Sequence, residues 1–155
     1  MAISVGEPLP EVTVYTASAE PLPLPSLVQG KPTVLLFFPA AFTRVCEKEL
    51  CTFRDGLAAY NDLGANVYAL SVDTPFTLKA YAQQLGLSFP LISDFDKAAT
   101  RALGLEIGLR GIMGFSQRAA LVVAPDGKVG WQWIAEVPSQ EPPYEEVAAA
   151  VRSVA

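Results

Sequence analysis

Residues 33 to 38, with the sequence TVLLFF, are the feature that most constrains the fold. A strand with one solvated face alternates apolar and polar side chains, whereas this run is apolar on both alternating faces. Such a strand lies in the middle of a sheet whose two faces are both covered. Pro39 ends it, because proline has no backbone N–H to donate to a neighbouring strand. The run therefore predicts a central strand with helices on both sides.

Helix-like and strand-like segments alternate along the rest of the chain, which is typical of an α/β domain with a mostly parallel or mixed sheet. Apolar spacing predicts further strands over residues 12–16, 66–72, 118–123 and 128–134, the last two joined as a hairpin by Pro125-Asp126-Gly127. Helices are predicted from Thr43 to Tyr60 and over 75–85, 98–103 and 143–151. With 155 residues and 51% hydrophobic content, we expect one domain over residues 1–155, with a central mixed sheet flanked by helices.

Two segments are predicted to lack regular structure. Residues 20–25 contain prolines at 21, 23 and 25, so they cannot join a sheet interior and are expected to form an extended loop. Residues 105–117 are rich in glycine and contain few polar side chains. They are therefore expected to form an ordered apolar loop rather than a flexible linker.

The charge balance argues against a nucleic-acid partner. Lys and Arg total 11 against 16 Asp and Glu, giving a net charge of -5 with no basic cluster to follow a phosphate backbone. Residues 1–14 show neither the basic segment nor the apolar run of a signal peptide, and the most apolar stretch, 34–42, is interrupted by Pro39. We therefore expect a cytoplasmic protein that binds neither nucleic acid nor a membrane.

The absence of histidine narrows the possible chemistry. It excludes Ser-His-Asp and Cys-His catalysis and most zinc or iron sites built on imidazole. The two cysteines, Cys46 and Cys51, are too few for a disulfide framework or a four-thiolate metal site. We expect no metal and no cofactor. A close cysteine pair in a cytosolic chain favours redox chemistry instead.

Cys46 lies where a helix is predicted to begin. With Thr43 as N-cap, Cys46 is the third helical residue, where free backbone N–H groups and the helix dipole favour a thiolate. Glu47 and Glu49 oppose this charge, so an arginine brought in by the fold would be needed to offset them. From these residues alone, a buried core cysteine and an ordinary helix cap stay open as alternatives.

Residues 39–46, PAAFTRVC, resemble the Pro-x-x-x-Thr/Ser-x-x-Cys active-site motif of the peroxiredoxin family. The resemblance extends over nearly the whole chain, through CTFRD from Cys51, ALSVD from Ala69, FPLISD from Phe89 and the strand that opens at Arg118. It implies a thioredoxin-like (peroxiredoxin) fold and a thiol-dependent peroxidase that reduces hydrogen peroxide and organic hydroperoxides.

The resemblance also implies roles for individual residues. Cys46 would attack the peroxide and become a sulfenic acid. Thr43 and Arg118 would bind the peroxide beside Cys46, with Arg118 stabilising charge on the separating oxygens. Pro39 would shield the pocket from water, and the apolar Phe42 would favour organic substrates. Before the resemblance is considered, Arg118 reads equally well as a surface arginine on a strand edge.

Cys51 follows Cys46 by five residues, the spacing of the bacterioferritin-comigratory and Q-type peroxiredoxins. That similarity implies an intramolecular disulfide, reduced by thioredoxin or a similar dithiol. The segment FFPAAFTRVCEKEL also resembles E-type bacterial peroxiredoxins, in which an outside thiol resolves the sulfenic acid and Cys51 would be a bystander.

Two rival functions stay open on the residues alone. A thioredoxin-like thiol-disulfide carrier would use Cys-x-x-Cys, but four residues intervene between the cysteines here. A non-catalytic α/β binding module would leave both cysteines inert. The sequence leaves the choice between monomer and homodimer open.

Overall fold

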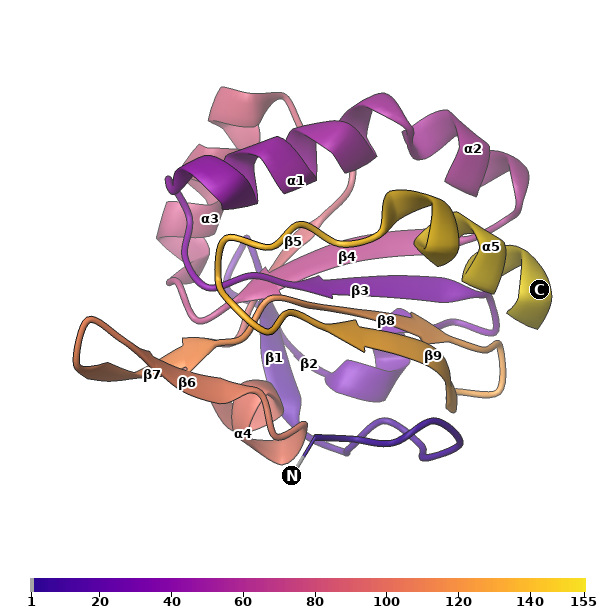
Figure 1. Cartoon of the computed structure of the whole chain (residues 1–155), viewed down its shortest axis with the longest axis horizontal. Helices are drawn as coiled ribbons and strands as arrows, with labels where there is room; N and C mark the ends of the chain where they lie inside the picture. The colour runs from indigo at the N-terminus through magenta and orange to yellow at the C-terminus, as the bar shows by residue number, and fades with distance from the viewer. Residues whose placement is uncertain (1) are drawn as a thin grey trace.

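The computed structural model describes residues 2–155 and is built on a seven-stranded sheet in the order β2-β1-β5-β4-β3-β8-β9 (Figure 1). These strands are β1 (Thr13–Thr16), β2 (Pro21–Pro23), β3 (Thr33–Phe37), β4 (Asn66–Ser71), β5 (Leu91–Ser93), β8 (Ala119–Val123) and β9 (Val129–Ile134). β3, β4 and β5 run parallel, and the remaining pairs are antiparallel. The predicted mixed sheet is confirmed.

β3 is the central strand that the TVLLFF run predicts. It pairs in parallel with β4 and antiparallel with β8, and all five of its residues are buried. Val34 and Leu36 enter one apolar cluster, while Leu35 and Phe37 enter a second cluster on the opposite face. The two-faced apolar pattern thus reflects two separate cores.

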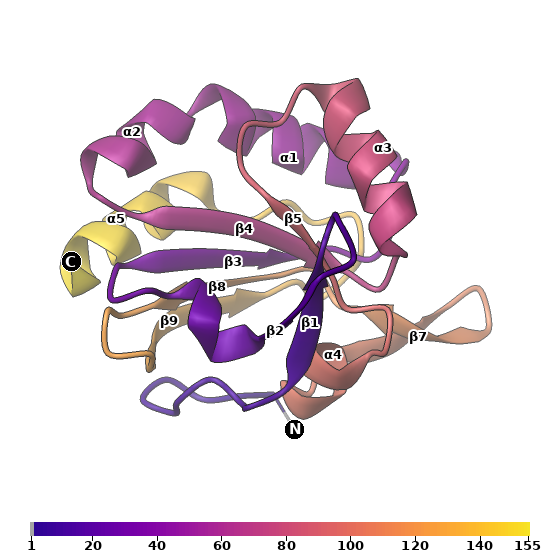
Figure 2. The ribbon, with the colours of Figure 1, turned by 180° about the vertical axis from the view of Figure 1, so that it is seen from behind.

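Helices cover both faces of the sheet (Figures 1 and 2). The helices are α1 (Arg44–Asp55), α2 (Leu57–Asp62), α3 (Pro75–Leu85), α4 (Ala98–Ala102), α5 (Tyr144–Val154) and the 3-10 helix Leu24–Leu27. Residues of α1, α2, α3 and α5 join the first cluster, whereas residues of α4 and the 3-10 helix join the second. Within residues 2–155 no helix is long and apolar enough to cross a membrane.

The helix predicted from Thr43 to Tyr60 is divided in two. α1 ends before Gly56, whose N–H donates to the Thr52 carbonyl at 3.1 Å, and α2 then begins at Leu57. Glycine is a poor helix former, and at Gly56 the backbone leaves helical geometry with ψ near 7°. The apolar period continues through the break, which is why spacing alone did not reveal it.

The prediction of an irregular loop over residues 105–117 is wrong. This segment is a hairpin of β6 (Glu106–Leu109) and β7 (Ile112–Ser116) that projects from the sheet (Figure 1). Leu109 pairs with Ile112, and the two turn residues Arg110 and Gly111 both have positive φ, 52° and 82°. Positive φ at both positions is the geometry of a tight hairpin turn.

Residues 20–25 also differ from the prediction. Pro21–Pro23 forms β2, which pairs with β1 at the edge of the sheet, and a 3-10 helix follows directly. An edge strand tolerates proline, so the exclusion from the sheet interior stands while the loop assignment is wrong. The strand β5, Leu91–Ser93, was not predicted, because three residues are too few to show a period.

Candidate active site

Cys46 is the third residue of α1, directly after the loop that follows β3. Thr43 occupies the N-cap with extended backbone (φ -109°, ψ 150°), and its carbonyl accepts the first helical hydrogen bond from the Glu47 N–H at 3.0 Å. The thiol therefore lies among the free N–H groups of the first turn, as predicted, and it is fully buried.

Arg118 places a cation directly against this thiol. It immediately precedes β8, the neighbour of β3, and its Nη2 donates to Cys46 Sγ at 3.1 Å. Nε and Nη2 also donate to the Pro138 carbonyl, at 3.1 and 3.0 Å. Arg118 is only 2% exposed, so the alternative of a surface arginine on a strand edge is wrong. Because the guanidinium is held at three points, it presents a fixed charge to the sulfur.

Glu49 forms a buried ion pair with Arg118, which was not predicted from the sequence. Its Oε1 accepts from Arg118 Nη1 at 2.7 Å, and the side chain is fully buried. Burial raises the pKa of Glu49 to about 7, although the charge and hydrogen bond of Arg118 act to lower it. From the sequence, Glu49 was predicted only to oppose the negative charge of the Cys46 thiolate. Its position three residues after Cys46, on the same helical face, was the signal that it shares the same cation.

The loop before Cys46 is held by contacts that the sequence reasoning missed. The Ala41 N–H donates to Asp73 Oδ2 at 2.8 Å, and the Ser71 hydroxyl donates to the same oxygen at 2.6 Å. Asp73 lies in the ALSVD stretch, after β4. Asp73 thereby ties the loop before Cys46 to the end of β4, the strand next to β3.

Three predicted site residues lie in this loop, in different environments. Pro39 is buried directly after β3. The Thr43 hydroxyl is exposed and donates to the Ala40 carbonyl at 2.8 Å rather than to Cys46. Its oxygen keeps a lone pair with which to accept from a substrate. Phe42 is 50% exposed and adopts φ of 64°, a conformation that non-glycine residues seldom occupy.

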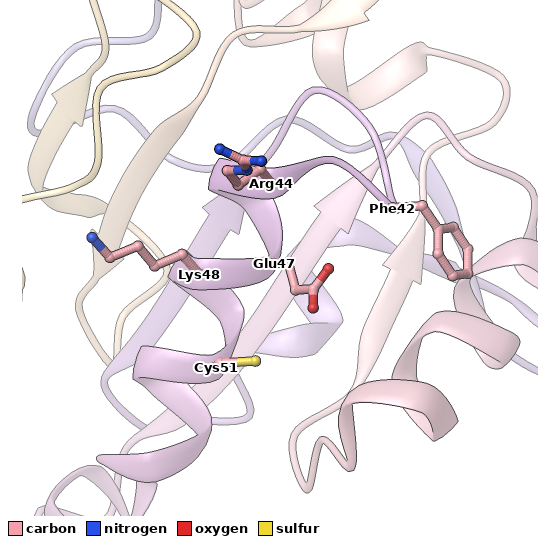
Figure 3. Close-up of a pocket in the computed structure, with 5 residues that line it drawn as sticks. All are labelled: Phe42, Arg44, Glu47, Lys48 and Cys51. Carbon is pink, nitrogen blue, oxygen red and sulfur yellow. The ribbon is translucent and has the colours of Figure 1, made fainter.

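Cys51 lies five residues after Cys46 on α1 and lines an open cavity of about 520 Å³ (Figure 3). The other lining residues are Phe42, Arg44, Glu47 and Lys48, and the Cys51 sulfur points into the same space as the Glu47 carboxylate. Both cysteines are free thiols, Cys46 buried and Cys51 partly exposed. The structure therefore joins Arg118 to Cys46 directly and keeps Pro39, Phe42 and Thr43 in the loop that leads to Cys46. Cys51 lies further along the same helix and is partly exposed.

Comparison with known proteins identifies the family. The AhpC/TSA family model matches residues 5–132. Alkyl hydroperoxide reductase E of Mycobacterium tuberculosis is 33% identical over 127 residues, which is 81% of each chain. The chloroplastic peroxiredoxin Q of Populus jackii is 33% identical over 111 residues, covering 72% of this chain and 52% of the relative. The chain belongs to the peroxiredoxin family.

Solved structures agree with this assignment. A peroxiredoxin-like protein from Aquifex aeolicus matches with a TM-score of 0.89 at 26% identity, covering 100% of this chain and 90% of the other. Reduced Prx3 of Vibrio vulnificus, in complex with hydrogen peroxide, matches with a TM-score of 0.86 at 27% identity, covering 96% and 99%. The thioredoxin-like fold is confirmed, and this peroxiredoxin is a peroxidase rather than a non-catalytic binding module.

We predict that removing the Arg118 cation slows peroxide attack by roughly 10² to 10³, because charge on the separating oxygens loses its fixed donor. Arg118→Ala alone would leave Glu49 buried without a partner and destabilise the fold. The informative comparison is therefore Arg118→Ala with Glu49→Gln against Glu49→Gln alone. Stopped-flow measurement of the second-order rate with hydrogen peroxide checks this. Equal rates in the two proteins would show that Arg118 has no role in peroxide attack.

A second prediction concerns the pH dependence of stability. The pKa of Glu49 is about 7 in the folded protein against 4.5 for an ordinary glutamate, so the folded state binds the extra proton between those values. The stability that this proton confers is complete below about pH 4.5 and is lost as the pH rises to about 7. Relative to Glu49→Gln, the wild-type free energy of unfolding should fall by up to about 3 kcal/mol across that window. Urea unfolding at both ends measures it, and parallel pH profiles for the two proteins would contradict the prediction.

Proposed function

We propose that Cys46 is the peroxidatic nucleophile of a single-domain enzyme spanning residues 1–155. The observation that carries this proposal is the hydrogen bond of 3.1 Å from Arg118 Nη2 to Cys46 Sγ at the start of α1. The thiolate attacks the terminal oxygen of a hydroperoxide, so that an S–O bond forms as the O–O bond breaks. Sulfur is oxidised to the sulfenic state, and the peroxide leaves as water or an alcohol after taking up a proton.

The surrounding residues have complementary roles in this proposal. Arg118 stabilises the thiolate and the developing oxyanion, and the Thr43 oxygen accepts a hydrogen bond from the incoming hydroperoxide. Pro39 keeps water from the buried thiol. The exposed ring of Phe42 provides an apolar surface next to Thr43, which suits organic hydroperoxides as well as hydrogen peroxide.

We further propose that Cys51 resolves the sulfenic acid. Attack by its thiolate on the Cys46 sulfur forms an intramolecular disulfide and releases water, and thioredoxin or a similar dithiol then reduces that disulfide. The partial exposure of Cys51 and the similarity to peroxiredoxin Q support this step. We also propose a cytoplasmic location, because a reducing compartment returns both cysteines to the thiol state between turnovers.

A one-cysteine mechanism is the second candidate. The 33% identity to alkyl hydroperoxide reductase E favours it, as does the position of Cys51 five residues beyond Cys46 on an intact helix. An external thiol would then attack the Cys46 sulfenic acid directly. The two mechanisms differ in whether Cys51 is required for turnover.

The cysteine variants distinguish these mechanisms. We expect Cys46→Ser to abolish peroxide reduction, since the serine hydroxyl is not ionised at neutral pH. Cys51→Ser should reduce one equivalent of peroxide and then stop when thioredoxin is the reductant. Coupled turnover with thioredoxin and thioredoxin reductase measures both. Continued turnover by Cys46→Ser would overturn the assignment of the nucleophile, and undiminished turnover by Cys51→Ser would favour the one-cysteine mechanism.

The disulfide cannot form while α1 is intact. Five helical steps rise about 7.5 Å and turn about 500°, which leaves the two Cα atoms roughly 8 to 9 Å apart on different faces. A disulfide rarely tolerates more than about 7 Å. The first turns of α1 must therefore unwind before Cys46 and Cys51 join, and the buried side chains of Leu50 and Phe53 lose packing when they do.

We accordingly predict faster amide hydrogen exchange over residues 45–53 in the oxidised protein than in the reduced protein. Amides of α4, which packs in the other apolar cluster on the opposite face of the sheet, serve as the internal control and should change little. Mass spectrometry of peptides after exchange measures both segments. Equal protection over 45–53 in both states, with the Cys46–Cys51 disulfide verified, would show that the disulfide forms without unwinding.

A further inference from the structure

Tyr81 carries a buried hydroxyl that has no hydrogen-bond partner in the described chain. The residue lies on α3, is fully buried and belongs to the same apolar cluster as Cys46. The backbone N–H of Phe42 lies close enough to the oxygen to lower the pKa of Tyr81, but without hydrogen-bond geometry. The O–H of the tyrosine is therefore a donor with no acceptor.

The ring of Tyr81 is fixed by both ends of the active-site loop. Its centroid lies 4.7 Å from that of Phe42 and 6.3 Å from that of Phe38. Phe38 directly precedes Pro39, and Phe42 directly precedes Thr43. The loop that leads to the thiol therefore packs on this tyrosine at both of its ends. α3 lies alongside α1 on the same face of the sheet (Figure 2).

The hydroxyl also lies within electrostatic reach of the thiols. Burial raises the pKa of Tyr81, and negative charge on Cys46, Glu47 and Cys51 raises it further, with Cys46 having the largest effect of the three. All three groups belong to α1. Together with the ring contacts to Phe38 and Phe42, this places Tyr81 next to the first turns of α1, on which the oxidised cysteine forms and is resolved.

A phenylalanine at position 81 would keep the ring packing and avoid burying an unpaired hydroxyl. Leaving a buried donor unsatisfied is destabilising, and such a group in a native protein calls for an explanation, of which a redox or catalytic role is one. The chemistry at Cys46 creates such a state, because it adds one oxygen atom to the sulfur in this region.

We propose that the Tyr81 hydroxyl is the hydrogen-bond donor to the oxygen that the peroxide leaves on Cys46. This inference rests on the proposed role of Cys46 as the peroxidatic thiol. Attack by the thiolate forms the S–O bond, breaks the O–O bond and yields a sulfenic acid, whose ionised sulfenate accepts from the phenol. The phenol itself stays protonated, because its pKa is raised. The interaction stabilises the sulfenate and holds its oxygen in one position until a thiol attacks the sulfur.

The test uses the Cys51→Ser protein, in which the sulfenic acid persists, with and without Tyr81→Phe. The ionisation of the sulfenic acid is read from the pH dependence of its reaction with dimedone. Without the phenol donor, the pKa of the Cys46 sulfenic acid should rise by about 1 to 2 units. This corresponds to the loss of one hydrogen bond to a charged group. Urea unfolding of the reduced Tyr81→Phe protein should show stability equal to or above that of its parent.

Tyr60→Phe is the matched control, since Tyr60 belongs to the same cluster but packs on Phe53, at a centroid distance of 5.7 Å. Tyr60→Phe should leave the pH dependence of the reaction between the sulfenic acid and dimedone unchanged. An unchanged profile in Tyr81→Phe, or the same shift in Tyr60→Phe, overturns the proposal. Loss of stability in reduced Tyr81→Phe also overturns it, because the hydroxyl would then have a partner before oxidation. Absence of any sulfenic acid on Cys46 in the parent overturns the proposed function as well, which separates the two failures.

Discussion

The guanidinium of Arg118 is the interaction on which the site depends. One side chain donates to the Cys46 sulfur, the Glu49 carboxylate and the Pro138 carbonyl, and so joins the start of α1 to the segment that follows β9. A buried arginine is tolerable only when it is paired and hydrogen-bonded, and these three acceptors take four hydrogen bonds from it. Two of them lie on one turn of α1, three residues apart. The cation therefore sets both the charge next to the thiol and the orientation of the helix that carries it.

The sheet is what brings this cation to the thiol. β3 and β8 are antiparallel, with Phe37 opposite Ala119, so the end of β3 lies beside the start of β8. The chain leaves β3 towards Cys46 at the same edge where Arg118 enters β8. A register shift of one residue would turn Arg118 to the opposite face of the sheet, away from α1. Burial of both faces of β3 opposes such a shift, because it would disturb two apolar cores at once.

How much of this the sequence predicts depends on the length of the pattern involved. The TVLLFF strand and the helix at residues 75–85 extend over enough residues to show their period, and both are found where expected. The hairpin at 106–116 and the strand at 91–93 are short, and their strand character comes from pairing with distant segments. At the site, the motif indicated Cys46, and the wider resemblance to the family indicated Arg118. Glu49, Asp73 and Tyr81 were missed because their importance arises from burial and contacts between elements.

Glu49 also bears on how α1 opens in the proposed disulfide mechanism. It lies between Cys46 and Cys51, so unwinding that segment separates its carboxylate from Arg118. One carboxylate oxygen is buried without a hydrogen bond, and burial raises the pKa of the group, which shows that the folded environment disfavours its charge. Transfer of Glu49 to water relieves that desolvation and offsets part of the cost of opening, which includes the packing lost by Leu50 and Phe53 and the partner lost by Arg118. A fully satisfied ion pair at this position would hold α1 more firmly closed. The incomplete pairing of Glu49 therefore lowers the free energy of opening at the segment where the two cysteines must meet.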